Sequence, residues 1–187
     1  MEKTLILLKH DSVSRGLVGE IISRFEKTGL KIIAMKMILP DEHLAKNHYF
    51  VDEEWARNVF EKTKAGYEKD NKPFPYKEPM ELGNQIQSWN MKFLREGPVI
   101  ALVLEGPHSI EIVRKMVGST EPKSSPPGTI RGDYAMIESY AIADSKGRVL
   151  RNLIHASDSV KSADREIALW FKPIEIQSYS KDLDKHF

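Results

Sequence analysis

The sequence predicts an α+β fold of the ferredoxin-like type, in which the order βαββαβ forms an antiparallel four-stranded sheet with helices on one face. Two observations carry this prediction. Short apolar runs, typical of buried strands, are followed by segments whose apolar residues recur at helical spacing, and this β-α-β order occurs twice. We expect residues 1–187 to form a single domain, with a helical insertion at about 51–95 and a smaller insertion at about 134–148.

The first β-α-β unit spans the first 40 residues. The apolar run Thr4–Leu8 predicts a strand buried on both faces. Apolar residues at helical spacing between Leu17 and Phe25 predict an amphipathic helix, which Thr28-Gly29 ends. Strand character returns from Lys31 to Ile38, and Pro40 closes that strand.

The second unit begins in the middle of the chain. Val99–Leu104 predicts a further buried strand, and the apolar stripe between Ile110 and Val117 predicts the helix that follows it. A short strand is expected at Leu153–Ala156. A last helix is expected to begin near Ser162, with Trp170 on its apolar face.

Two stretches fall outside this scheme. The charged insertion reads as a helix from Asp52 to Lys69, a Pro-rich turn from Asn71 to Pro79 and a second helix from Glu81 to Leu94. The smaller one, Tyr134–Arg148, carries the turn signal Asp144-Ser145-Lys146-Gly147, and we expect a small hairpin there.

Composition narrows the function classes. The 28 Lys and Arg residues nearly balance 27 Asp and Glu residues, so a net charge of +1 gives no general attraction to nucleic acid or to anionic membranes. An anionic ligand would therefore need a local basic cluster. The chain has no cysteine, which excludes disulfides and thiolate metal sites, and it shows no membrane-length apolar stretch. We expect a cytoplasmic protein that does not enter membranes.

His155 is the candidate for chemistry, because it leaves an apolar run and is followed by small hydroxyl and carboxylate residues. A structural histidine is the alternative. His155, Ser157 and Asp158 are too close in sequence for a hydrolase triad, and zinc-ligand spacing is absent. The remaining role for His155 is that of a nucleophile. Glu166 shares the core-facing stripe of its helix with Trp170, where an unpaired carboxylate is costly. A neighbouring imidazole would suit Glu166; the alternative is an acid favoured by the helix dipole.

Anion-binding donors are offered by the turn-rich loop Gly118–Asp133. Its three prolines restrict the loop, and its hydroxyl and cationic side chains, Thr120 and Arg131 among them, suit phosphate oxygens. A solvated surface loop is the alternative. The loop is not a Walker motif, and the chain has no G-x-G-x-x-G. Lys9 at a strand end and Arg114 off the apolar stripe of its helix are weaker candidates.

Several motifs in order resemble the nucleoside diphosphate kinase family. The resemblance rests on Lys9-x-Asp11, Arg15–Ile22, His48-Tyr49, Gly97-Pro98-Val99, Arg114-x-Met116-x-Gly118-x-Thr120-x-Pro122, Pro127–Asp133, Asn152–Ser159 and Glu166. It implies the ferredoxin-like fold and a ping-pong transfer of the γ-phosphoryl group of ATP or another NTP to an NDP, which maintains NTP pools.

The resemblance also implies roles for particular residues. His155 would be phosphorylated, and Glu166 would orient it with help from Ser157. The phosphates and ribose of the NTP or NDP substrate would be held by Lys9, Tyr49, Arg114, Thr120, Arg131 and Asn152. The family uses Mg²⁺, which we expect the nucleotide phosphates to hold rather than metal-ligating side chains. It forms hexamers or tetramers, so we expect a homo-oligomer with no specific nucleic-acid partner.

The chain departs from the family pattern in three places. His10 stands where proline is usual, and Ala156 replaces a common glycine. The aromatic residue that stacks on the base has no motif-defined counterpart; Trp55 and Phe60 are candidates by chemistry, and each could instead pack the inserted helices. The competing hypothesis is a non-catalytic nucleotide- or RNA-binding ferredoxin-like module, but the strands lack the aromatic and basic pattern of an RNA-binding sheet.

Overall fold

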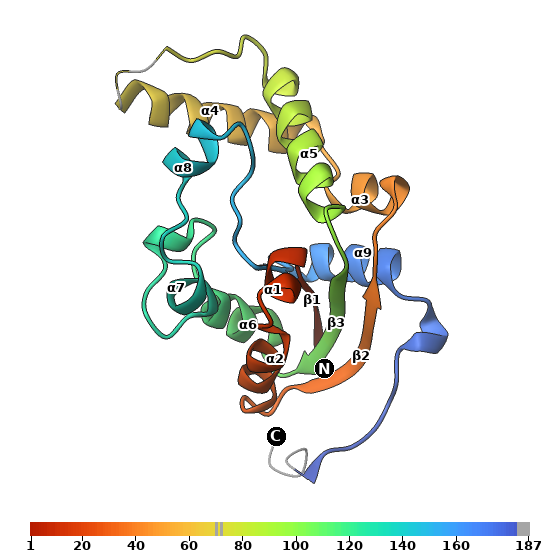
Figure 1. Cartoon of the computed structure of the whole chain (residues 1–187). Coiled ribbons are helices and arrows are strands. Elements are labelled where there is room, and N and C mark those ends of the chain that lie inside the picture. Colours follow the sequence, from red (N-terminus) through yellow and green to blue (C-terminus); the bar gives the residue numbers. More distant parts are fainter. Residues whose placement is uncertain (70, 72, 183–187) are drawn as a thin grey trace.

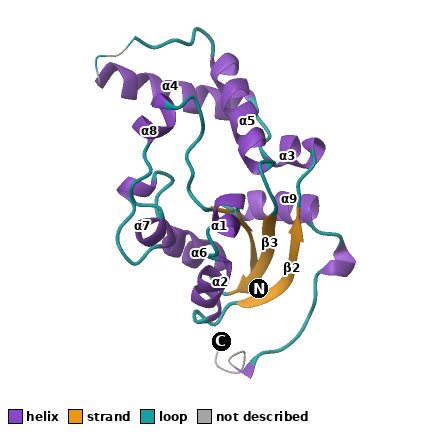
Figure 2. Cartoon of the chain, viewed as in Figure 1, coloured by secondary structure: helices purple, strands orange, loops and turns teal. Residues whose placement is uncertain are grey.

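A four-stranded antiparallel sheet organises the chain. The computed structural model describes residues 1–69, 71 and 73–182, and the strands lie in the order β2-β3-β1-β4 (Figure 2). Their bounds are β1 Glu2–Leu8, β2 Lys31–Ile38, β3 Val99–Gly106 and β4 Ile154–Ala156. Every neighbouring pair is antiparallel. The predicted ferredoxin-like α+β class is confirmed.

The helices account for most of the remaining described chain (Figure 1). Their bounds are α1 His10–Ser14, α2 Val18–Glu26, α3 Glu42–His48, α4 Glu53–Lys69, α5 Pro79–Leu94, α6 Ser109–Val117, α7 Ile130–Tyr134, α8 Tyr140–Ser145 and α9 Val160–Trp170, with 3₁₀ turns η1 Pro122–Ser124 and η2 Pro173–Glu175. Hydroxyl groups cap three of them: Thr129 accepts from the backbone of α7, Ser139 from that of α8, and Ser159 from that of α9. Across the described ranges, no helix is long and apolar enough to cross a membrane.

Helices cover both faces of the sheet, so the expectation that they lie on one face was wrong. Ile6 and Leu8 of β1 belong to a core with α2 and α6, the crossover helices of the two β-α-β units. Leu5 and Leu7 point the other way, into a core with α3 and α9. The physical reason is the continuous apolar run of β1, which leaves both faces of the sheet to be covered.

The segment between β2 and β3 contains α4 and α5, which pack against each other at the top of Figure 1. Phe74 packs the connection between them against α4: its ring lies 5.1 Å from that of Phe60 and 5.4 Å from that of Tyr67. The expected turn at 71–79 includes Lys72, which lies outside the described residues.

The expected hairpin at 134–148 was wrong, because this stretch forms the short helix α8. The Ser139 hydroxyl accepts from the backbone N–H of Ile142, which provides the first turn with an N-cap. The Ala and Ile residues that follow favour this helix, and the Lys146-Gly147 turn signal marks its end.

The C-terminal segment returns to the outer edge of β2. The backbone N–H of Gln177 donates to the carbonyl of Ile33 at 2.7 Å, and the Tyr179 hydroxyl donates to that of Ile32 at 3.1 Å. The register of β2 against β3 shifts between Ile32 and Ala34. The segment therefore covers the first half of this edge strand.

Candidate active site

The candidate site lies beyond one end of the β1–β4 pair. Leu7 pairs with His155 across the two strands, and Leu8 pairs with Ile154. Lys9, directly after β1, is thereby placed beside Asn152, directly before the turn into β4. The sheet thus brings together two segments that lie 143 residues apart in sequence.

His155 is held by α9. Its Nε2 atom lies 2.9 Å from Oε2 of Glu166, and the hydroxyl of Ser157 donates to the same oxygen at 2.7 Å. Because a carboxylate accepts only, this contact puts the ring proton on Nε2 and leaves the lone pair on Nδ1. About a quarter of the His155 side chain is exposed, against 5% of Glu166, so the open nitrogen can meet a substrate.

Glu166 is charged despite its burial. Burial raises the pKa of its carboxyl, but His155, the hydrogen bond from Ser157 and the charge of Arg165 outweigh it, and the net pKa shift is downward. The remaining oxygen accepts from Arg165 at 3.4 Å. A buried carboxylate with these partners can hold a neighbouring imidazole in one tautomer and compensate a positive charge on it.

His48 on α3 lies against His155, with ring centroids 4.5 Å apart. It forms with His155 and Glu166 a cluster whose potential ligand atoms lie within 4.8 Å of one another. However, the indole N–H of Trp170 donates to Nδ1 of His48 at 3.2 Å, which places the His48 proton on Nε2. Burial and the nearby positive groups hold the pKa of His48 well below its usual range. The lone pair that a metal would need is therefore already used.

Lys9, Asn152 and Thr120 form a connected group. The Lys9 ammonium donates to Oδ1 of Asn152 at 2.8 Å, and the Asn152 amide donates to the carbonyl of Thr120 at 2.9 Å. Burial and the charge of Arg131 lower the pKa of Lys9 to about 8, although Asp11 opposes them. A buried ammonium without a neighbouring anion destabilises the free protein. A bound phosphate would relieve this cost, as expected of a lysine that binds phosphate.

Arg131 joins the loop to β4. Its guanidinium donates to the carbonyls of Asn152, Ile154, Gly118 and Ser119. These bonds use four of its five N–H donors, so the side chain fixes the walls of the site as well as contributing charge. Burial and the charge of Arg114 lower the pKa of Arg131 to about 10.

Arg114 and Tyr49 have unused polar groups. The exposed guanidinium of Arg114 makes no hydrogen bond or ion pair within the described part of the chain, and it borders a hollow of about 720 Å³ with Asp158 and Val160. The buried hydroxyl of Tyr49 has no hydrogen-bond partner among the same residues. Burial and the charges of Glu166 and Asp11 raise the pKa of Tyr49, so its hydroxyl is a neutral donor.

Leu153 adopts a left-handed backbone conformation between Asn152 and β4, with φ of 67°, although it is fully buried and not glycine. This conformation costs about 1 to 2 kcal/mol in an L-residue. Its N–H donates to Oδ2 of Asp11 at 3.0 Å. Its carbonyl accepts from the backbone of Lys9 at 2.8 Å and from the hydroxyl of Ser12 at 2.7 Å.

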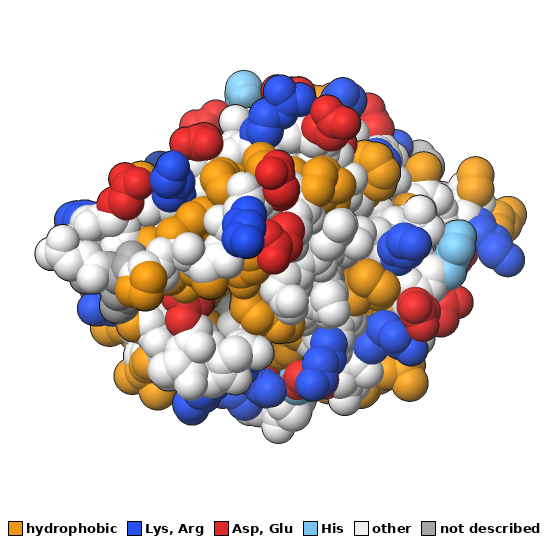
Figure 3. Space-filling model, turned by 90° about the horizontal axis from the view of Figure 1, so that it is seen from above, with side chains coloured by type: hydrophobic (Ala, Val, Ile, Leu, Met, Phe, Trp, Pro, Cys, Tyr) orange, Lys and Arg blue, Asp and Glu red, His pale blue; other side chains and the backbone are white. Residues whose placement is uncertain are grey.

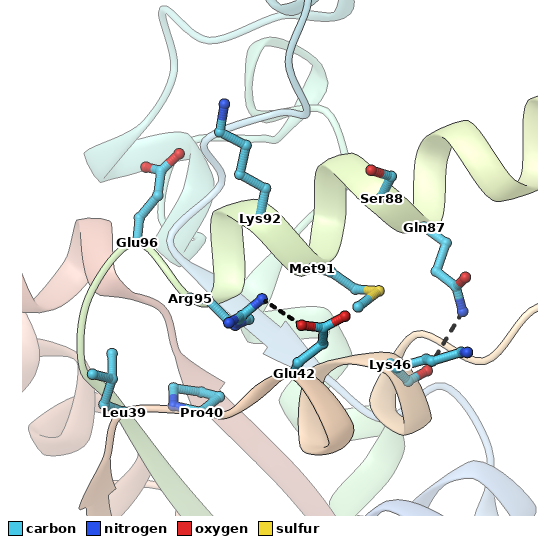
Figure 4. Close-up of a pocket in the computed structure, with 10 residues that line it drawn as sticks. All are labelled: Leu39, Pro40, Glu42, Lys46, Gln87, Ser88, Met91, Lys92, Arg95 and Glu96. Carbon is cyan, nitrogen blue, oxygen red and sulfur yellow. Dashed lines mark hydrogen bonds and ion pairs between the residues drawn. The ribbon is translucent and has the colours of Figure 1, made fainter.

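A second hollow, of about 680 Å³, lies between α3 and α5 (Figure 4). Its Arg95 and Glu42 side chains pair at 3.6 Å, while Met91 lies beside them and Lys92 extends away. Neither hollow includes His155 in its lining. Figure 3 shows cationic and anionic side chains interspersed over the upper face, which agrees with the balanced charge. The hollow between α3 and α5 therefore lacks His155, and its three cationic side chains, Lys46, Lys92 and Arg95, are largely balanced by Glu42 and Glu96.

Sequence reasoning assigned no role to His48, Arg165 or Asp11, which the structure places in the site. Asp11 follows a strand end by three residues, a position that could have drawn attention to it. The two base-stacking candidates lie in α4. Phe60 is buried against Phe74, whereas Trp55 is partly exposed.

Comparison with known families gives one result over most of the chain. The sequence model of the family described as nucleoside diphosphate kinase matches residues 2–68 and 82–176. A nucleoside diphosphate kinase of Pyrobaculum aerophilum is 47% identical over 180 residues, which cover 94% of this chain and 98% of that protein. One from Pyrococcus furiosus is 42% identical, with 98% of this chain and 91% of that protein covered.

Solved structures agree with these sequences. A crystal structure of an NDP kinase from Pyrobaculum aerophilum superposes with a TM-score of 0.90 at 44% identity, covering 95% of this chain and 99% of that one. A transition-state mimic of the nucleoside diphosphate kinase from Borrelia burgdorferi, with bound vanadate and ADP, superposes with a TM-score of 0.81 at 38% identity. It covers 99% of this chain and 95% of its own.

Proposed function

The chain belongs to the nucleoside diphosphate kinase family and has that family's phosphotransferase activity, and we propose that Nδ1 of His155 is the atom that carries the phosphoryl group. The observation that supports this assignment is the 2.9 Å contact between Nε2 of His155 and Glu166. It leaves Nδ1 as the nucleophilic nitrogen. The alternative of a non-catalytic nucleotide- or RNA-binding module is thereby set aside.

The proposed reaction has two half-steps. The Nδ1 lone pair attacks the γ-phosphorus of the bound NTP, a P–N bond forms, and the bond to the β-phosphate oxygen breaks as the NDP leaves. Nε2 keeps its proton, and Glu166 compensates the positive charge that the phosphorylated ring acquires. A second NDP then takes the phosphoryl group by the reverse path, which restores the neutral imidazole.

We assign the nucleotide contacts to the six predicted residues. Lys9, Arg114 and Arg131 would neutralise phosphate charge, and the hydroxyls of Tyr49 and Thr120 would donate to phosphate oxygens. Asn152, already bonded to Lys9, would hold the ribose. The support is geometric: the Arg114 guanidinium and the Tyr49 hydroxyl have polar atoms unengaged by the described residues, and Lys9 donates to one neutral amide.

We propose that Mg²⁺ enters with the nucleotide and is held by its phosphate oxygens. Mg²⁺ prefers hard oxygen ligands, whereas the three-residue cluster found in the described chain contains two imidazoles, one of them blocked by Trp170. The ion would supply charge neutralisation on the transferring group. The side chains would orient the nucleotide around it.

The assembly is a further proposal. Met35 and Met37 of the edge strand β2, and Leu39 directly after it, are exposed where a second copy of the chain would bury them. We propose a homo-oligomer, a hexamer or tetramer, built from one domain over 1–187 to which the α4–α5 segment at about 51–95 and the 134–148 segment are insertions. We place its work in the cytoplasm, where nucleotide pools are used.

The test is direct. Incubation with γ-labelled ATP should give an acid-labile, base-stable phosphoprotein that loses its label when GDP is added. His155→Ala should show no label while it still binds ADP. Labelling that persists in this variant would move the nucleophile to another residue.

A further inference from the structure

The strongest unexplained feature of the site is the buried carboxylate of Asp11. Its residue is 6% exposed, and one oxygen, Oδ1, has no hydrogen-bond partner among the described residues. A buried carboxylate oxygen without a hydrogen-bond partner destabilises the folded protein, so its presence calls for an explanation. A site built to hold anionic phosphates gives no obvious reason to keep one.

The other oxygen of Asp11 binds the backbone of Leu153. Oδ2 accepts the N–H of Leu153, the residue in the left-handed conformation. Lys9 and Ser12 hold the carbonyl of Leu153, so the segment 9–12 engages both backbone polar groups of the strained residue. Such strain persists only where the surroundings impose it.

The backbone conformation of Leu153 sets the positions of the residues on both sides of it. Asn152 precedes it and bonds Lys9, while β4 with His155 follows it. A change in φ at Leu153 would therefore turn Asn152 away from Lys9 and displace His155 from Glu166. Asp11 and Lys9 hold the two backbone polar groups of the same residue, Leu153, and the negative charge of Asp11 favours the charged form of Lys9 against burial and against Arg131.

We propose that Asp11 is a positioning residue for phosphoryl transfer, which locks Leu153 in its left-handed conformation and keeps the neighbouring Lys9 ammonium charged. It acts through Leu153 and Lys9 and does not touch the substrate. The titratable and charged groups that interact with Lys9 are Asp11 from α1, Arg131 from α7 and His48 from α3. The proposal rests on the proposed role of Lys9 in binding phosphate.

Two variants separate the two parts of this role. Asp11→Asn keeps an oxygen that can accept the Leu153 N–H but removes the charge. Asp11→Ala removes both. The matched control is Asp41→Asn, an exposed carboxylate that accepts the backbone N–H of Leu44 at 2.7 Å outside the site.

The measurements are kcat/KM at pH 7 and ADP affinity from pH 6.5 to 9.5, both per folded molecule. Asp11→Ala should lose about 10- to 100-fold in kcat/KM, the equivalent of one charge-assisted hydrogen bond. Asp11→Asn should stay within about threefold of wild type at pH 7, but its ADP affinity should begin to fall at a lower pH, with an additional loss of about fivefold at pH 8.5. Asp41→Asn should match wild type throughout.

A purely structural residue would change stability and leave these quantities unaltered. Wild-type kcat/KM in folded Asp11→Ala would overturn the positioning role of Asp11. A wild-type pH profile in Asp11→Asn, which is expected to fold, would overturn its effect on Lys9. The variant Lys9→Met identifies the other failure: if it binds ADP as tightly as wild type, the proposed role of Lys9 fails, while kcat/KM of Asp11→Ala still decides whether Asp11 positions Leu153.

Discussion

Oε2 of Glu166 accepts two hydrogen bonds at once, from Nε2 of His155 at 2.9 Å and from the Ser157 hydroxyl at 2.7 Å. Glu166→Ala removes the group that fixes the imidazole tautomer, so we expect kcat to fall about 100-fold. ADP affinity should change by less than about threefold, because Glu166 is placed on the histidine and away from the nucleotide. Steady-state turnover at saturating substrate measures the first quantity and calorimetry the second. An unchanged kcat would contradict the assignment; Ser157→Ala should give a smaller loss.

Lys9 should reduce the stability of the free protein. Its pKa is about 8 in the fold against 10.5 in the unfolded chain, so the unfolded chain binds more protons between these values and the free energy of unfolding rises with pH across that window. Lys9→Met should raise this free energy at pH 7 by about 1 to 3 kcal/mol and abolish the rise. It should also weaken ADP binding. Urea unfolding at pH 7 and pH 10 is the measurement, and a less stable variant at both pH values would contradict it.

Trp170 should prevent Zn²⁺ from binding in the site and inhibiting the enzyme. Its indole N–H occupies Nδ1 of His48. Trp170→Phe frees that nitrogen to carry the proton, so Nε2 of His48 can then coordinate Zn²⁺ with His155 and Glu166. We expect half-inhibition at an about tenfold lower Zn²⁺ concentration in the Mg²⁺-ATP assay. The double variant Trp170→Phe, His48→Phe should lose this sensitivity, and equal inhibition of all three proteins would exclude the idea.

Removal of Mg²⁺ should stop transfer without loosening the fold. If the nucleotide phosphates hold the ion, EDTA has no structural ion to extract from the protein. Activity should fall more than about 100-fold and return with added Mg²⁺, while the thermal midpoint of the nucleotide-free protein stays unchanged. A lowered midpoint in EDTA would instead indicate a site made by the protein.

Charge on the β2 edge should dissociate the oligomer. The double substitution Met35→Glu and Met37→Glu places two carboxylates where we expect a second copy to pack. The mass of the native assembly should fall, as measured by light scattering. Glu61→Lys, an exposed position on α4, is the control and should leave the mass unchanged. A wild-type mass in the double variant would place the interface elsewhere.

Much of the fold could be predicted because its signals are local. The bounds of β2 were predicted to the residue, and α6 ends before Gly118 as expected. The two failures have different causes. The cap at Ser139 that starts α8 is a local signal that the hairpin prediction passed over. The apolar run of β1 already indicated two covered faces, but which helix covers the second face depends on where α9 packs, and no single window of sequence specifies that.

The site could be anticipated only in part. Helical spacing placed Glu166 on the buried side of its helix, where the structure puts its carboxylate against His155. The turn at Leu153 could not be read from the sequence, because leucine rarely adopts positive φ and the contacts that impose it come from residues 141 or more positions away.

The placement of β1 has a consequence for how the chain matures. This strand is made first, yet it lies inside the sheet between β3, about 100 residues later, and β4, about 150 residues later. Its apolar run Leu5–Leu8 therefore leaves the ribosome long before any strand can pair with it. Such late, non-local pairing slows folding and leaves an aggregation-prone segment exposed, so shielding of Leu5–Leu8 until β3 has been synthesised would favour correct folding.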